Sequence, residues 1–282
     1  MKIIRVLRNT IIIAIIMLLI YYYGYYSPNN NIVILNEDIS STLIDEKLND
    51  FKIVVFSDVL YNDDFSNFET AIQLINEENA DIVVFAGDLL HPNKINNLSD
   101  SEQNELIELL TNINSKYGKF AVLGENDDAT NLDLTTLLFN SNFEVIDNKA
   151  LKISNESSTY FNLIGLENTI DNSYNTDSIY AGISNQHYTI TICHTPDILS
   201  DITNETNLLI AAHTLGGEQN LPIYGPLKSI NGMDKYYNGI HTVNNSTIVI
   251  SNGIGSFSDY RLFAQMNIVS ITLHNKNNSD SN

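Results

Sequence analysis

The chain has few of the residues that mark two common classes of protein, disulfide-stabilised domains and nucleic-acid-binding proteins. Its one cysteine, Cys193, excludes an internal disulfide bond. Its 14 lysine and arginine residues are outnumbered by 34 aspartate and glutamate residues, which gives a formal net charge of -20. Because binding to nucleic-acid phosphates needs clustered basic side chains, this composition excludes a nucleic-acid partner. No internal repeat is visible in the sequence.

What the sequence has instead is enough apolar material for a large core. Hydrophobic residues make up 43% and charged residues 17% of the 282 positions. That balance is typical of a globular chain, and the length suits one large α/β domain with an appendage.

The N-terminal segment has the pattern of a membrane anchor. Basic residues lie within positions 1–8, and an uncharged, mostly apolar stretch follows in positions 9–26. This stretch is close to the shortest length that crosses a hydrocarbon core of ~30 Å. It ends in a belt of tyrosines, which suits a membrane interface. The members of this belt are Tyr21, Tyr22, Tyr23, Tyr25 and Tyr26.

The charges around this stretch predict its orientation. Basic residues precede the span and none follows it closely, so we expect the N-terminus in the cytoplasm and the rest of the chain outside. A cleaved signal peptide is the alternative, but no A-x-A arrangement of small residues follows the apolar run. The sequence therefore favours an uncleaved, single-pass anchor in the cell membrane.

The remaining chain divides into three predicted parts. Positions 27–50 are expected to form a linker and a first strand, positions 51–274 a folded domain, and positions 275–282 a disordered polar tail. The basic residues of the first segment lie outside the domain, so the domain is more acidic than the whole chain. An anionic membrane surface repels such a domain, and we expect the helix alone to tether it.

Strands and helices alternate in the first half of the domain, whereas the second half is richer in strands. This pattern predicts a sheet with helices on its faces, followed by a second sheet that completes a sandwich. Strands are predicted at 32–35, 51–56, 81–85, 120–123, 143–146, 151–153, 161–164, 188–193, 208–212, 239–243, 247–250 and 268–273. Helices are predicted at 68–75, 101–117 and 198–202.

Four predicted strands end at acids or histidines. These residues are Asp58, Asp88, His194 and His213. A single histidine at a strand end is most often a hydrogen-bonded structural residue, and His213 alone would be interpreted in that way. Because the arrangement occurs four times, we predict a metal or catalytic site at the rim of the sandwich.

These residues stand in motifs that resemble the calcineurin-like metallophosphoesterases, and among them the bacterial branch with an N-terminal membrane anchor. The similarity covers about residues 50 to 273 and rests on five motifs in order, together with a C-terminal stretch at 251–264. The motifs read Asp58-Val59-Leu60, Gly87-Asp88, Gly124-Glu125-Asn126-Asp127, Cys193-His194 and Ala212-His213-Thr214-Leu215-Gly216-Gly217. The resemblance implies an α/β fold, a four-layer αββα sandwich that holds two metal ions.

The motifs depart from the family pattern mainly on one side of that site. Leu60 and Leu215 stand where the family has two histidine ligands of the first metal ion, so that ion would keep only Asp58 and the bridging Asp88. Asn126 stands where the family has its catalytic histidine, and Asp127 beside it is either a solvated loop acid or a residue that orients a neighbour.

The second metal ion would keep most of its ligands. The resemblance assigns it Asp88, His194 and His213, with Glu125 in place of the family's asparagine. Two nitrogens and two carboxylate oxygens suit zinc, manganese or iron, so we expect at most one divalent transition metal and no second ion. A slip of one residue, with Asn126 as the ligand, stays open. His91, in the loop after Asp88, is expected to be exposed.

Two hypotheses about function follow from the resemblance. In the first, the protein is a membrane-anchored phosphoesterase that acts on a phosphate ester of the cell envelope, with hydrolysis impaired because one metal site and the catalytic histidine are missing. In the second, it is an inactive pseudoenzyme that acts as an extracytoplasmic binding or scaffolding domain. The sequence leaves both open.

Overall fold

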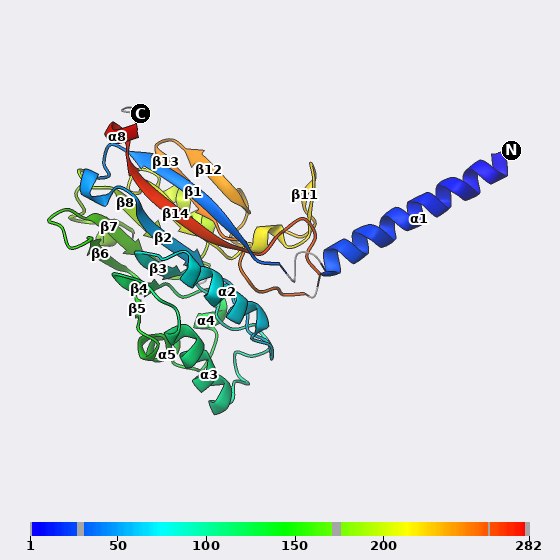
Figure 1. The fold of residues 1–282 in the computed structure, drawn as a ribbon, viewed down its shortest axis with the longest axis horizontal. Helices are drawn as coiled ribbons and strands as arrows, with labels where there is room; N and C mark the ends of the chain where they lie inside the picture. Colours follow the sequence, from blue (N-terminus) through cyan, green and yellow to red (C-terminus); the bar gives the residue numbers. More distant parts are fainter. Residues whose placement is uncertain (1, 27–30, 171–175, 259, 280–282) are drawn as a thin grey trace.

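The computed structural model describes residues 2–26, 31–170, 176–258 and 260–279 (Figure 1). The first of these segments forms helix α1 (Lys2–Tyr26), which extends away from the rest of the molecule as a straight rod. Among the described residues, α1 is the one helix that is long and apolar enough to cross a membrane. A helix of this kind near an N-terminus serves either as an anchor or as a signal sequence.

The first sheet has six strands, four of which run in one direction and two in the other. Its order is β1 (Val33–Ser41), β14 (Asn267–Asn275), β2 (Phe51–Phe56), β3 (Ile82–Phe85), β4 (Gly118–Ala121) and β5 (Phe143–Val145). Strands β2 to β5 are parallel, while β14 pairs antiparallel with β2 and parallel with β1. Strand β1 is longer than predicted because it pairs with β14 along its whole length.

The second sheet also has six strands. Its order is β12 (Gly239–Val243), β13 (Ser246–Ile250), β9 (Leu208–Ala211), β8 (Thr189–Ile192), β7 (Phe161–Gly165) and β6 (Lys149–Ile153). The four central strands are parallel, and the two edge strands pair antiparallel with their neighbours.

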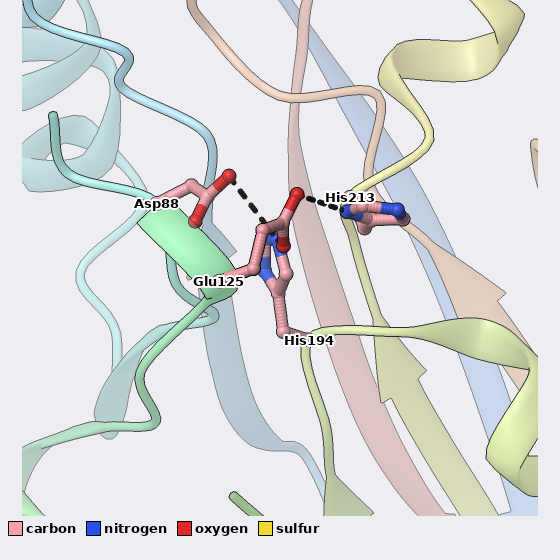
Figure 2. A group of neighbouring side chains, drawn as sticks. All are labelled: Asp88, Glu125, His194 and His213. Carbon is pink, nitrogen blue, oxygen red and sulfur yellow. Dashed lines mark ion pairs between the residues drawn. The ribbon is translucent and has the colours of Figure 1, made fainter. Parts of the chain in front are cut away.

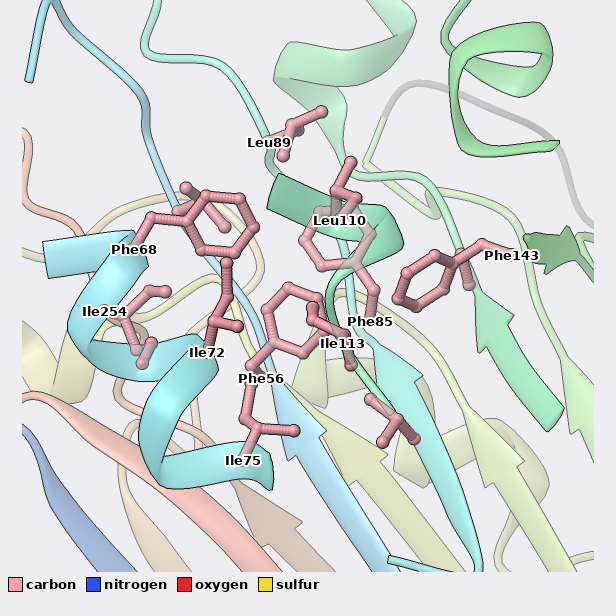
Figure 3. Packing of buried hydrophobic residues seen from close by; sticks show 14 of the residues in the cluster. Phe56, Phe68, Ile72, Ile75, Phe85, Leu89, Leu110, Ile113, Phe143 and Ile254 are labelled. Carbon is pink, nitrogen blue, oxygen red and sulfur yellow. The ribbon is translucent and has the colours of Figure 1, made fainter. Parts of the chain in front are cut away.

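Alternation of side chains along the strands builds three apolar layers. Ile53 and Val55 of β2 point inward and share one buried cluster with Ile190 and Ile210 of the second sheet, so the sheets pack face to face. Val54 and Phe56 point the other way and pack beneath helices α2 (Ser66–Glu77), α3 (Asp100–Thr111) and α5 (Leu134–Asn140), as Figure 3 shows around Phe56.

The second sheet is covered on its outer face as well. Leu209 and Ile248 pack there against residues of η2 (Pro196–Ile198), α7 (Leu199–Ile202) and α6 (Thr176–Tyr180). The layers are therefore helix, sheet, sheet and helix, which confirms the predicted αββα sandwich. The remaining elements are short: η1 (Glu46–Leu48), α4 (Glu125–Asp128), η3 (Leu215–Gly217), β10 (Asn220–Leu221), β11 (Gly225–Pro226) and α8 (Lys276–Ser279).

Two predicted boundaries are wrong. Helix α3 ends at Thr111 instead of residue 117, because the chain turns at Asn112 and then bonds to the loop before β3, where Tyr117 N–H donates to Asp81. The tail does not begin at residue 275. Asn275 ends β14 and its buried side chain donates to Ile44, and residues 276–279 form α8. Residues 280–282 lie outside the described residues.

Candidate metal centre

The candidate site lies where strands of both sheets end. Asp58 follows β2, Asp88 follows β3, and α4 follows β4, while His194 and His213 follow β8 and β9. Since the carboxyl ends of parallel strands meet at one edge of a sheet, these side chains converge at the rim of the sandwich. The structure brings them together at the edge where the sequence predicts a site.

Four of these side chains form one compact group (Figure 2). Asp88, Glu125, His194 and His213 each offer one ligand atom, and the four atoms lie within 4.8 Å of one another. His194 Nε2 is 3.4 Å from Asp88 Oδ2 and 3.1 Å from Glu125 Oε2. His213 Nδ1 is 2.9 Å from Glu125 Oε1. The carboxylate of Glu125 thus bridges the two imidazoles.

Backbone carbonyls fix which nitrogen of each imidazole faces the group. His194 Nδ1 donates to the carbonyl of Ala86 at 2.7 Å, and His213 Nε2 donates to the carbonyl of Asn231 at 2.7 Å. The other nitrogen of each ring then faces Glu125, and in the neutral imidazole it carries the lone pair. Hydrogen bonds of this kind orient histidine ligands in metal sites.

The inward-facing atoms have no hydrogen-bond partner among the protein atoms. His194 Nε2, His213 Nδ1 and Glu125 Oε2 are all buried in this condition. Lone pairs that face one another inside a protein repel unless a cation or a proton lies between them. Two imidazole nitrogens and two carboxylate oxygens are a ligand set that suits zinc, manganese or iron, so the residues present fit one divalent transition metal.

The ionisation of the group shows the same demand for positive charge. Burial disfavours the imidazolium, but Asp88 and Glu125 raise the pKa of His194 well above its usual value. Burial also opposes ionisation of Glu125, yet the adjacent imidazoles of His194 and His213 hold the pKa of this carboxyl well below its usual range. The carboxylate of Glu125 therefore stays ionised, and its negative charge favours a cation at the centre of the group.

Asp127 is not a solvated loop acid, because its side chain is buried and holds two motifs together. Its carboxylate accepts backbone N–H groups of Asp88 at 2.7 Å, Leu89 at 2.8 Å and Gly124 at 3.0 Å. Burial, together with the charge of Asp88, raises the pKa of Asp127 to about 7. The residue thus orients the segment that carries Asp88, which was the second interpretation of the sequence.

Asn126 is engaged with Asp88 through both its backbone and its side chain. Its backbone N–H donates to Asp88 Oδ1 at 3.0 Å, and its side-chain amide donates to Asp88 Oδ2. Of the two registers left open by the sequence, this geometry favours the one in which Glu125 is the ligand. An amide in this position has no proton to transfer at neutral pH, unlike an imidazolium.

The other side of the site lacks imidazoles. Leu60 and Leu215 are buried there, and Gly253 lies against both Asp58 and Leu215. Asp58 accepts the backbone N–H of His213 at 3.3 Å through Oδ2, while its buried Oδ1 has no partner. Burial raises the pKa of Asp58 to about 6, with His194 lowering it and Asp88 raising it further.

Two residues near the site have positions that the sequence did not predict. His91 is buried, not exposed, because its Nδ1 accepts the N–H of Asn93 and its ring lies 6.1 Å from that of Phe257. Arg261 is fully buried and donates to the carbonyls of Leu215, Asn252 and Gly255 at 2.6 to 2.7 Å. Its place in the stretch 251–264 was the only sequence signal for it.

Comparisons with known proteins give the family of the chain and its relatives. A family model described as calcineurin-like phosphoesterase matches residues 51–251. The uncharacterized metallophosphoesterase YkuE of Bacillus subtilis is 27% identical over 245 residues, which cover 85% of this chain and 84% of that protein. An uncharacterized metallophosphoesterase of Aquifex aeolicus is 26% identical over 219 residues, 74% of this chain and 79% of that protein. The solved structure of GAP50 from Plasmodium has 12% identity and a TM-score of 0.47, covering 78% of this chain and 80% of that one.

Proposed function

The chain belongs to the calcineurin-like phosphoesterase family, and we propose that it is a membrane-anchored, extracytoplasmic member that binds one divalent metal and has impaired hydrolysis. The observation that carries the proposal is the contrast within the site. One complete group of four ligands stands beside a side where leucines occupy two ligand positions.

The four ligands would hold one zinc, manganese or iron ion, which supplies Lewis acidity toward a phosphoryl oxygen. Asp88 and Glu125 provide the negative charge, and His194 and His213 provide nitrogens already oriented by backbone carbonyls. A second ion and a positioned histidine acid are what a fast phosphoesterase of this type uses in addition. The loss of a general acid alone lowers rates by roughly 10² to 10⁴.

The membrane anchor is α1. Every residue of α1 except Gly24 is exposed, so the helix has no role in the core of the domain. Basic residues at its start and tyrosines at its end match an N-terminus in the cytoplasm and a domain outside. Protease added to intact protoplasts is expected to digest the domain, and protection until lysis would contradict this orientation.

A cavity next to the site supports a phosphate ester of the cell envelope as the ligand. It has a volume of about 730 Å³ and is bounded by Tyr25 and Tyr26 at the end of α1 and by Leu60, His91 and Gly255 near the site. Asparagine, serine and aspartate side chains form much of the remaining wall: Asn62, Asp64, Ser66, Asn67, Asn93, Ser256 and Ser258. A ligand at the membrane surface would enter here and reach the rim.

The second candidate function is a catalytically inactive domain that binds or scaffolds. It is favoured by the engagement of Asn126, whose amide is bonded to Asp88 and presents no acid to a ligand. The two candidates differ in whether hydrolysis takes place at the site.

The deciding experiment restores the missing groups in the full chain. The triple variant Leu60→His, Asn126→His and Leu215→His is expected to bind a second ion and to hydrolyse an aryl phosphodiester at least ~10²-fold faster than the wild type. Each single change should do little, because catalytic groups that act as a unit are not additive. The matched control carries glutamine at the same three positions, which adds polar volume without imidazole.

Metal content per chain is measured in the same preparations. We expect at most one ion in the wild type and two in the triple variant. A wild type that turns over at ordinary enzymatic rates, of order 1 to 10³ per second, would show that another residue has replaced the histidine. A folded triple variant with two ions and no activity would support the binding domain.

A further inference from the structure

The short hairpin of β10 and β11 exposes apolar side chains at its tip. Ile223 is fully exposed, Tyr224 is 81% exposed and Leu227 is 53% exposed. The run from residue 219 to residue 227 has no charged side chain, although the whole chain has a net charge of -20. Several exposed apolar side chains close together, with no charge among them, are typical of a surface that contacts a membrane or another protein.

The backbone of the tip adds a second observation. Ile223 has φ of 72°, a left-handed conformation that a β-branched residue rarely adopts. Strain of this kind persists where the surrounding structure imposes it, and it concentrates at functional positions. Burial of the isoleucine does not explain this strained backbone, because its side chain is fully exposed.

The hairpin is joined to the end of α1 through the loop at 260–263. At the hairpin base, Asn220 N–H donates to Leu262 O and Leu262 N–H donates to Glu218 O, each at 2.8 Å. On the other side of this loop, Arg261 N–H donates to Gly24 O at 3.0 Å.

Aromatic contacts reinforce the junction. The rings of Tyr23 and Phe263 lie 5.4 Å apart, and the ring of Tyr260 occupies the space where a Cβ of Gly24 would stand. The hairpin and the helix end therefore form one connected unit, and Figure 1 shows β11 projecting from the domain beside the end of α1.

We propose that the hairpin tip inserts into the interface of the bilayer that α1 crosses, as a second contact of the domain with the membrane. The proposal rests on the membrane anchor of the proposed function. Tyrosine is enriched at the headgroup level of membranes. Transfer of an exposed isoleucine from water to the boundary of the acyl chains lowers the free energy of the system. Repulsion by anionic lipids, which led us to expect tethering by the helix alone, does not act on an uncharged tip.

The contact would set the orientation of the site. The hairpin begins a few residues after His213, and Leu215 lies between them. Insertion of the tip would hold this edge of the sandwich toward the bilayer, with the cavity at Tyr25 and Tyr26 at membrane level. Ligands carried by the membrane would then have the shortest path to the metal centre.

The test uses the absence of tryptophan from the natural chain. Three variants of the full chain each carry one tryptophan: Tyr224→Trp at the tip, Phe139→Trp on α5 and Ile16→Trp within α1. Phe139 is the matched control, because it is 74% exposed and α5 lies far from α1 in Figure 1. Each variant is reconstituted in nanodiscs of phosphatidylcholine and phosphatidylglycerol, with or without lipids that carry a nitroxide quencher.

We expect the nitroxide lipids to quench fluorescence of the Tyr224→Trp and Ile16→Trp variants at least twofold and to leave the Phe139→Trp variant unchanged. Iodide in the water should quench only the Phe139→Trp variant strongly. If the Ile16→Trp variant is quenched by lipid and the Tyr224→Trp variant is not, the tip contact is wrong and the anchor stands. If neither is quenched by lipid, both are wrong. Shielding of the Tyr224→Trp variant from iodide without lipid quenching would indicate a protein on the tip and would also overturn the proposal.

Discussion

On one side of Asp88, two imidazoles and the carboxylate of Glu125 turn lone pairs toward a common point, whereas on the other side Leu60 and Leu215 stand beside Asp58. The first side presents buried atoms that a cation or a proton would satisfy. On the second side the buried Oδ1 of Asp58 has no hydrogen-bond partner and lies 4.0 Å from His194 Nε2. The two sides therefore share one imidazole and differ in the side chains at 60 and 215.

The backbone conformation is left-handed on both sides of the site. Asp88 and His213 have φ of 62° and 71°, and Leu60 and Leu215 have φ of 47° and 51°. Leucine pays roughly 1–2 kcal/mol for this left-handed conformation, which it has no local reason to adopt.

Bonds from elsewhere in the fold hold these turns. Leu60 N–H donates to the Asp88 carbonyl at 3.2 Å, and Arg261 donates to the Leu215 carbonyl at 2.6 Å. The fold thus holds left-handed turns whether an acid, a histidine or a leucine occupies them. We therefore expect that imidazoles can be placed at positions 60 and 215 without a change in the backbone.

The largest expected difference between the two sides is in metal affinity. His213→Ala removes one of four ligands and is expected to weaken binding of Mn²⁺ or Zn²⁺ by about a thousandfold, since even the loss of an outer partner of a ligand costs 10- to 100-fold. Leu215→Ala, on the other side, should change affinity less than about threefold. Both variants remove a buried side chain, so lost packing does not explain a difference. Equal losses in titration calorimetry would show that the two sides are not distinct.

A second prediction concerns Asp127, which supports only the ligand side. Asp127→Ala leaves three buried N–H groups without an acceptor, and each such group costs about 1–3 kcal/mol. We expect the free energy of unfolding to fall by about 3 kcal/mol or more in denaturant titrations. Asp127→Asn keeps an acceptor oxygen and should lose less. An unchanged unfolding free energy for Asp127→Ala would mean that water replaces the carboxylate.

The strands and the position of the site could be predicted from the sequence alone. Apolar runs that end in Asp58, Asp88, His194 and His213 were sufficient to predict the strands and the meeting point of their ends. Periodicity and strand-end chemistry are local, and parallel sheets convert them directly into a site.

Other features depend on contacts between distant segments, which local patterns do not encode. The orientation of Glu125 and Asn126 is decided by hydrogen bonds across the site, and the end of α3 by bonds to the loop before β3. The burial of His91 and Arg261 likewise depends on the loop at 252–258, far along the chain. One sequence alone does not show which distant residues become these partners.

A third prediction returns imidazoles to the leucine side alone. The double variant Leu60→His and Leu215→His buries two polar rings, so without metal its free energy of unfolding should fall by about 2 kcal/mol. Saturating Mn²⁺ should restore most of this loss, because a ligand at 100 times its Kd stabilises the folded state by about 2.7 kcal/mol. The Leu60→Gln and Leu215→Gln double variant should lose stability and regain no more with Mn²⁺ than the wild type gains. Thermal melts with and without metal distinguish the two, and no difference between them would argue against a preserved backbone.

The smallest expected effect comes from Asp147, a partly buried acid outside the ligand group that serves as a reference. Burial raises the pKa of Asp147 to about 7 from an ordinary value of 3.8, although its carboxylate accepts the Leu123 N–H at 3.2 Å. A carboxyl whose pKa is higher in the folded state stabilises the fold while it is protonated, so this contribution is complete below pH 4 and is lost as the pH rises to 7. Asp147→Asn keeps the acceptor and cannot ionise, so it should match the wild type near pH 4 and exceed its stability by about 1 to 2 kcal/mol above pH 7, after allowance for solvent screening. Metal should leave this difference unchanged, whereas it should alter the pH dependence that Asp58 contributes beside the ligand group. Denaturant titrations from pH 4 to 8, with and without Mn²⁺, check both statements, and parallel pH profiles for wild type and Asp147→Asn would show that Asp147 is solvated when folded.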